Sequence, residues 1–101
     1  MLGDEHKATV DGYARSVLEA WVGGGRSMTE FAEKAGLTPQ AVSQIRLGQW
    51  GVGMKGLRGF SHALGVTLSD FEEAALAWHA AGRPPLGPEA LAGVNNNGGG
   101  K

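Results

Sequence analysis

Apolar residues recur at helical spacing in five stretches of this chain, and strand-like alternation is absent from it. The first predicted helix covers about residues 9–22. Its apolar stripe consists of Val10, Tyr13, Val17 and Trp21, widened by Ala14, Leu18 and Ala20. Three consecutive glycines follow at 23–25, where we expect this helix to end.

The second stretch carries clear signals of where a helix begins and ends. Ser27 can cap the helix through its hydroxyl, and Glu30, three residues later, completes the pattern of a capping box. The apolar stripe that follows is Met28, Phe31, Ala32 and Ala35. Gly36 suits the left-handed conformation that stops a helix, so we expect a short helix between Ser27 and Gly36.

A third helix is predicted to begin directly after this turn. Thr38 is its expected cap, and Pro39 occupies the first helical position, where a missing N–H costs nothing. The two helix starts therefore lie eleven residues apart. Val42 and Ile45 form the inward pair, and Gly48 closes the helix. The residues that lie off this stripe are Gln40, Ala41, Ser43 and Gln44.

Two more helices are predicted further along the chain. One covers about residues 54–64 and must tolerate Gly56 and Gly59, each of which costs up to about 1 kcal/mol relative to alanine, so it depends on packing. The other follows Thr67, where Asp70 repeats the capping pattern, and extends to about residue 81. Its apolar stripe is Leu68, Phe71, Ala75 and Trp78.

These elements predict an all-α fold, a compact bundle of about five helices in one small domain. We expect a mobile N-terminal arm at 1–7, the helical domain at 8–81 and a flexible C-terminal tail at 82–101, because the tail holds too little apolar surface to offset the entropy of ordering it. The last part, NNNGGGK, has the composition of a linker.

The segment 27–48 resembles the helix-turn-helix of the lambda-repressor/Cro (XRE-type) class of bacterial and phage proteins. The shared pattern is a small residue at Ala32, where the helices cross closely, glycine at Gly36 and branched residues at Val42 and Ile45. The flanks also match the fourth helix of that class and its exit, at Leu57, Phe60, Ala63, Leu64, Gly65 and Val66. The resemblance covers roughly residues 10–80 and implies a lambda-repressor-like fold.

Net charge argues against a nucleic-acid partner, because DNA-binding domains are usually basic and this chain has a formal charge of -1. The distribution of charge along the chain weakens this argument against DNA binding. Residues 26–66 carry five basic side chains against two acidic ones, whereas residues 1–25 and 67–82 are both net acidic. The positive charge therefore coincides with the helix-turn-helix, and its modest size predicts few phosphate contacts.

The resemblance implies that the outward residues of the third helix enter the major groove of DNA. Gln40 and Gln44 stand four residues apart on one face, and a glutamine amide matches the N6/N7 edge of adenine. We therefore predict Gln40, Ser43 and Gln44 as base contacts. The alternative is that the glutamines are ordinary solvated residues and that Ser43 is simply small.

A second set of residues is predicted to contact the DNA backbone: Thr38, Gln49, Trp50, Lys55 and Arg58. For Thr38 the alternative is a cap alone, and for Lys55 and Arg58 it is a solvated surface. Trp50 is the unexpected member of this set. Its indole N–H can donate to a phosphate, but a core anchor for the next helix is the favoured interpretation.

Chemistry other than binding finds little support in the sequence. The three histidines are scattered, and with no cysteine neither a disulfide framework nor a thiolate metal site is available. We predict no enzyme, no cofactor and no metal site. Apolar runs stay well short of the roughly twenty residues of a membrane span, so a cytoplasmic location without a membrane partner is expected.

The sequence thus predicts a sequence-specific regulator that binds double-stranded DNA, a phage-type or prophage-type repressor on near-palindromic operators. A homodimer through the fifth helix is expected, because Leu76 lies off the stripe of that helix and needs another partner. The alternative is a helix-turn-helix scaffold used for protein–protein interaction, such as an antitoxin, with weak or no DNA binding.

Trp21 and Arg46 carry a further prediction. The resembling class often has an arginine and a glutamate at these two positions, which form an ion pair between the first and third helices. Both residues differ here, and an indole opposite a guanidinium can form a cation–π contact. We therefore predict an aromatic–arginine pair that clamps the two helices together. In the alternative, Trp21 is only a core residue and Arg46 points to solvent or to phosphate.

Overall fold

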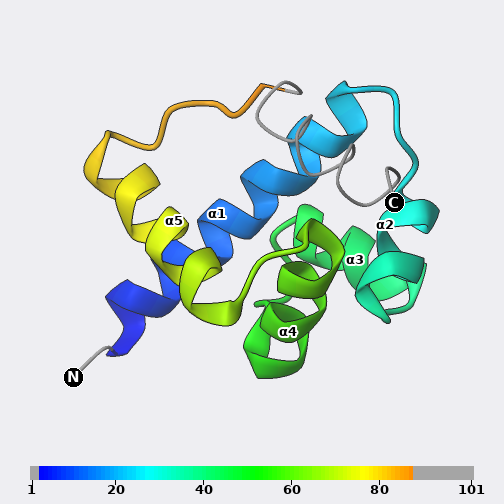
Figure 1. Ribbon diagram of the computed structural model, residues 1–101, viewed down its shortest axis with the longest axis horizontal. Helices are drawn as coiled ribbons and strands as arrows, with labels where there is room; N and C mark the ends of the chain where they lie inside the picture. The colour runs from blue at the N-terminus through cyan, green and yellow to red at the C-terminus, as the bar shows by residue number, and fades with distance from the viewer. Residues whose placement is uncertain (1–2, 88–101) are drawn as a thin grey trace.

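Helices are the only regular secondary structure in the part of the chain that the computed structural model describes, residues 3–87 (Figure 1). They are α1 (Gly3–Gly23), α2 (Met28–Ala35), α3 (Pro39–Arg46), α4 (Gly53–Leu64) and α5 (Leu68–Ala80). The long α1 crosses the molecule, α5 and α3 pack against it, and α4 packs on α2 and α5. The predicted all-α bundle is confirmed.

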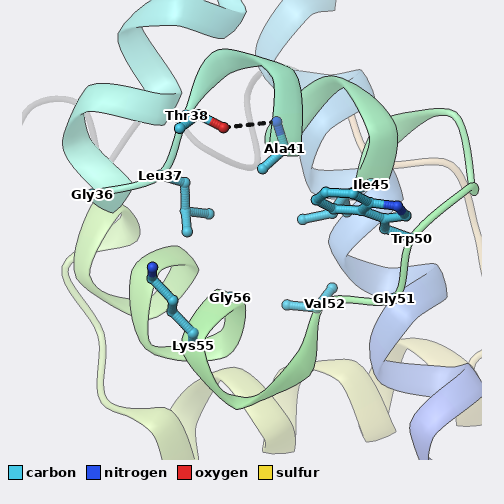
Figure 2. Close-up of a pocket in the computed structure, with 10 residues that line it drawn as sticks. All are labelled: Gly36, Leu37, Thr38, Ala41, Ile45, Trp50, Gly51, Val52, Lys55 and Gly56. Atoms are coloured by element: carbon cyan, nitrogen blue, oxygen red, sulfur yellow. Dashed lines mark hydrogen bonds between the residues drawn. The ribbon is translucent and has the colours of Figure 1, made fainter.

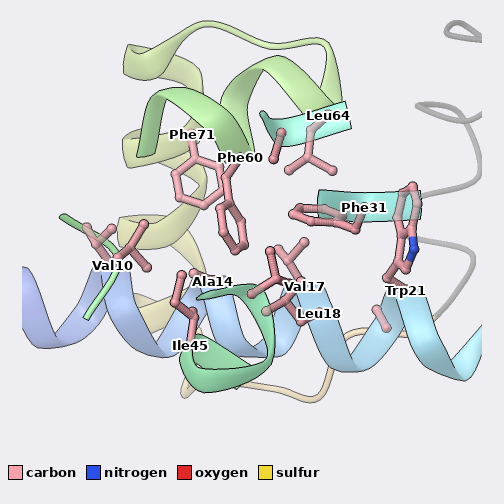
Figure 3. Close-up of a cluster of buried hydrophobic side chains, with 14 of the residues drawn as sticks. Val10, Ala14, Val17, Leu18, Trp21, Phe31, Ile45, Phe60, Leu64 and Phe71 are labelled. Atoms are coloured by element: carbon pink, nitrogen blue, oxygen red, sulfur yellow. The ribbon is translucent and has the colours of Figure 1, made fainter. Parts of the chain in front are cut away.

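The core forms where the apolar stripes of the helices meet (Figure 3). Aromatic rings run through its centre: Phe31 lies 5.0 Å from Trp21 and 4.8 Å from Phe60, between ring centroids, and Phe60 lies 6.1 Å from Phe71. Edge-to-face packing of this kind contributes beyond the burial of apolar area. This row of aromatic rings thus connects α1, α2, α4 and α5.

Two glycines in α4 are explained by close packing. A Cβ atom at Gly59 would lie 2.5 Å from the carbonyl oxygen of Ala35 on α2, and one at Gly56 would lie 2.6 Å from Cγ1 of Val52. Both glycines are buried. Helix propensity is therefore lost at Gly59 because α2 and α4 approach too closely for a side chain, and at Gly56 because Val52 fills the space.

The N-terminal boundary differs from the prediction. Helix α1 begins at Gly3, earlier than the predicted start at about residue 9, so residues 3–7 of the expected arm are helical, while residues 1–2 lie outside the described part. The cause is tertiary. His6 Nε2 lies 3.6 Å from Glu72 Oε2 on α5, and Thr9 and Val10 are already buried. The polar sequence of this turn gives no amphipathic signal that predicts it.

The segment after α5 corresponds to the start of the expected tail. Residues 83–87 have no regular structure, but they are held against the bundle. Trp78 Nε1 donates a hydrogen bond of 2.8 Å to the carbonyl oxygen of Pro84, and Leu86 packs against the core. The tail that was expected from residue 82 thus begins with a stretch that contacts the bundle, and its flexibility stays a prediction. The rest of it, residues 88–101 with NNNGGGK, lies outside the described residues.

Candidate nucleic-acid interface

Helices α2 and α3 are joined by a three-residue turn whose geometry follows the predicted capping residues. Ser27 Oγ accepts from the Glu30 amide at 3.0 Å, and Thr38 Oγ1 accepts from the Ala41 amide at 3.1 Å. Gly36 ends α2 in the left-handed region, with φ of 70°. These predictions are confirmed, and they fix where α3 begins.

The predicted capping box at Ser27 is only half formed. The Glu30 carboxylate accepts hydrogen bonds from the Arg26 guanidinium, one turn earlier, instead of from the Ser27 amide. This hydrogen bonding is the main reason that the pKa of Glu30 lies below its ordinary value. The negative charge of Glu30, beside the start of α2, is thereby balanced by the positive charge of Arg26.

Helix α3 presents a polar face to solvent. Val42 and Ile45 are buried beneath it, as predicted, with 0% and 4% exposure. Gln40 and Ser43 are exposed on the opposite face, and Leu47, directly after the helix, is 65% exposed on the same side as Gln40. Gln40 and Ser43 are therefore free to contact a partner laid along α3.

Gln44 is placed differently from Gln40. Its side chain is only partly exposed, and its Oε1 atom is buried without a hydrogen-bond partner among the described residues. An amide oxygen that water cannot reach is unfavourable unless a new donor is supplied. Contact of Gln44 Oε1 with a base thus requires the side-chain amide to reorient, and the predicted role of Gln44 stays a prediction.

The connection between α3 and α4 exposes its tryptophan. Trp50 is 55% exposed, so the favoured interpretation of it as a core anchor is wrong. Val52, two residues later, takes the core position instead and is only 7% exposed. The Val52 amide donates to Asp11 Oδ1 on α1 at 3.0 Å, which ties the connection to the bundle. Gln49 is exposed beside Trp50.

Four exposed cations on α1, α2 and α4 form no ion pair among the described residues: Arg15, Lys34, Lys55 and Arg58. Lys55 and Arg58 were predicted as backbone contacts and are exposed on α4. Arg15 was not singled out from the sequence. Its Nε donates to the carbonyl oxygen of Arg46 at 3.4 Å, so it stands at the C-terminal end of α3.

Arg15 belongs to a polar stripe on α1 that sequence analysis missed. Asp11, Arg15 and Glu19 are spaced by four residues, which places them on one face of the helix. Asp11 binds the α3–α4 connection, whereas Arg15 and Glu19 both bind Arg46. The spacing was visible in the sequence, but only the fold shows that this face lies along α3.

The predicted cation–π pair between Trp21 and Arg46 is wrong. Arg46 forms an ion pair with Glu19, with Nε 3.0 Å from Oε2 and Nη2 3.3 Å from Oε1. Hydrogen bonds to Glu19 raise the pKa of Arg46 above its ordinary value. The ring of Trp21 is instead covered by Arg26, whose Cζ lies 3.7 Å from the ring centroid.

The physical reason lies in where the two side chains point. Trp21 is 1% exposed and turns toward α2, where its Nε1 donates to the Ser27 carbonyl at 2.8 Å. Arg46 lies at the edge of α3, within reach of Glu19 on the exposed side of α1. A clamp between α1 and α3 does exist, but it is an ion pair.

Comparison with family models, with curated proteins and with solved structures yields no match to this chain. Among residues 3–87, the structure holds no group of three or more His, Asp or Glu side chains placed to bind a metal ion. Within the same residues, no helix has the length and apolar character needed to cross a membrane. The function of this chain is therefore inferred from its local geometry.

Proposed function

We propose that this chain is a sequence-specific double-stranded DNA-binding regulator of the lambda-repressor/Cro (XRE-type) kind, with α3 as its recognition helix. The observation that carries the proposal is the arrangement of α3. The helix is capped at Thr38 and anchored by the buried Val42 and Ile45, and it presents Gln40 and Ser43 to solvent. A short helix held in this way by a preceding helix and a tight turn suits the major groove.

The charges around α3 support an anionic partner. Glu19 and Glu30 are each paired with an arginine, so they repel a phosphate backbone less than their number suggests. Arg15, Lys55 and Arg58 have no acidic partner among the described residues. The local balance is therefore more positive than the net charge of -1 indicates.

Within this proposal the side chains have distinct roles. Gln40 and Ser43 contact base edges, and Gln44 joins them after its side-chain amide reorients. Backbone contacts come from Thr38, Gln49, Trp50, Lys55 and Arg58, to which Arg15 is added here. We further propose a cytoplasmic homodimer on near-palindromic operators, of the phage or prophage repressor type. Its interface lies on α5, where Leu76 is 45% exposed.

Selection of binding sites from random duplex DNA tests the proposal directly. We expect enrichment of one symmetric motif, with half-sites about one helical turn apart. Fluorescence anisotropy then compares the selected duplex with a scrambled one at fixed salt. Gln40→Ala is expected to lower specific affinity by about 1–3 kcal/mol and to leave affinity for the scrambled duplex unchanged. Equal losses on both duplexes would refute base contact by Gln40.

A second candidate function rests on the exposed apolar side chains between the end of α3 and the start of α4. Leu47, Trp50 and Met54 lie within eight residues of one another in the chain and are 65%, 55% and 61% exposed. Large apolar side chains left exposed on the surface are typical of a protein-binding site, although Met54 lines a second pocket with His6, Val10 and Glu72 and Trp50 does not. If selection enriches no motif and anisotropy detects no binding even at low salt, the protein–protein interaction function, including that of an antitoxin, replaces the first proposal.

A further inference from the structure

A pocket of about 430 Å³ lies between the α2–α3 turn, α3 and the start of α4 (Figure 2). Its apolar lining comes from Leu37, Ala41, Ile45 and Val52. Figure 2 shows the indole of Trp50 beside Ile45 at one end and the side chain of Lys55 near Leu37 at the other. The volume falls within the range of sites that bind small molecules, about 300–1,000 Å³.

We propose that this pocket binds a small aromatic carboxylate. The flat apolar body of such a ligand would lie on the indole of Trp50 and the apolar lining, and its carboxylate would lie at the Lys55 ammonium. Lys55 is the only charged residue that lines the pocket, and it has no acidic partner among the described residues. The charge of the site thus selects an anion over a cation.

The state of Trp50 supports a flat ligand. An indole that is 55% exposed leaves apolar area in contact with water, and covering it is favourable in proportion to the area removed. Trp21 and Trp78, the other two tryptophans, are 1% and 8% exposed and are already covered by the bundle. A ring stacked on Trp50 would therefore gain contact area that neither of the other two indoles offers.

The backbone around the pocket is held in place before any ligand arrives. The Val52 amide is fixed by Asp11 on α1, and Thr38 Oγ1 is fixed by the Ala41 amide. A site whose walls are already ordered loses little entropy when a ligand binds. The exception is Lys55, whose exposed side chain can swing toward the carboxylate.

The position of the pocket has a consequence for DNA binding, and this consequence alone rests on the proposed function. Trp50 and Lys55 line the pocket and are also proposed contacts to the DNA backbone. A bound carboxylate would neutralise Lys55 and occupy the face of Trp50. Ligand binding is therefore expected to weaken affinity for DNA, so the pocket would act as an inhibitory effector site.

The test is a titration of the ¹⁵N-labelled full chain with 2-naphthoate, followed by two-dimensional NMR, with 2-naphthamide as the matched uncharged probe. We expect shift changes confined to amides of Leu37, Ala41, Val52 and Lys55, and binding of the amide weaker by about fivefold, the scale of one partly exposed ion pair. Equal affinity for the two probes would overturn the role of Lys55. Shift changes centred elsewhere, or none at millimolar probe, would overturn the site.

Three variants sharpen the test. Lys55→Gln is expected to reduce naphthoate affinity about fivefold and to leave naphthamide unaffected, whereas Lys34→Gln, an exposed lysine on α2 outside the pocket, changes neither. Ala41→Leu fills the pocket and should abolish binding of both probes while the spectrum stays folded. Unchanged naphthoate binding in Ala41→Leu would refute the pocket. Because no DNA is present, these results stand or fall independently of the proposed function.

Discussion

Replacement of Gly59 by alanine tests whether the approach of α2 to α4 limits the fold. The new methyl group would lie 2.5 Å from the Ala35 carbonyl oxygen and 3.3 Å from the Ala35 Cβ. Both atoms belong to or sit on the backbone of α2, so no rotamer change relieves the contact and the helices must move apart. Overpacking of this kind costs about 1–3 kcal/mol.

The substitution also brings a gain, because alanine is favoured over glycine in a helix interior by about 1 kcal/mol. Since the obstacle is backbone, we expect a cost in the upper part of that range, about 2–3 kcal/mol, which leaves a net loss of about 1–2 kcal/mol in the free energy of unfolding. For a domain of this size that corresponds to a fall in Tm of about 4–8 °C per kcal/mol.

Circular dichroism during thermal and urea denaturation measures this loss. Gly56→Ala is the matched control: it offers the same propensity gain in the same helix but meets a Val52 methyl group, 2.6 Å away, instead of α2. We expect a smaller loss for this control because no second helix has to move. A Gly59→Ala protein as stable as the parent would show that α2 and α4 are free to separate and would refute the argument.

Three further predictions concern polar contacts. Asp11→Ala should lower the free energy of unfolding by about 1–3 kcal/mol in urea denaturation, because it leaves a partly buried amide of the α3–α4 connection without its acceptor; an unchanged midpoint would contradict this. A double-mutant cycle of Glu19→Gln and Arg46→Met should show favourable coupling that shrinks as NaCl rises to about 0.5 M, and coupling insensitive to salt would rule out an exposed ion pair. The lowered pKa of Glu30 means that its contribution to stability is present above its unfolded pKa and is lost as pH falls through its folded pKa. In Arg26→Met the free energy of unfolding, measured as a function of pH, should therefore fall less in the acid range than in the parent protein. An equal fall in both proteins would exclude the Arg26 contact as its cause.

Much of the local structure follows from the sequence alone. The caps at Ser27 and Thr38, the left-handed Gly36 and the inward pair Val42 and Ile45 were all predicted and are confirmed. Each of these features depends on residues no more than a few positions apart, because capping hydrogen bonds and helical periodicity act over one or two turns. The exposure of Gln40 and Ser43 follows from the same periodicity.

What the tertiary structure alone decided is which distant residues meet. Arg46 pairs with Glu19, 27 residues away, and the Val52 amide is bound by Asp11, 41 residues away. Trp50 stays in solvent because Val52 fills the core position. These outcomes depend on where α1 lies against α3 and the α3–α4 connection. That placement is set by the summed packing of all five described helices, and no local pattern in the chain records it.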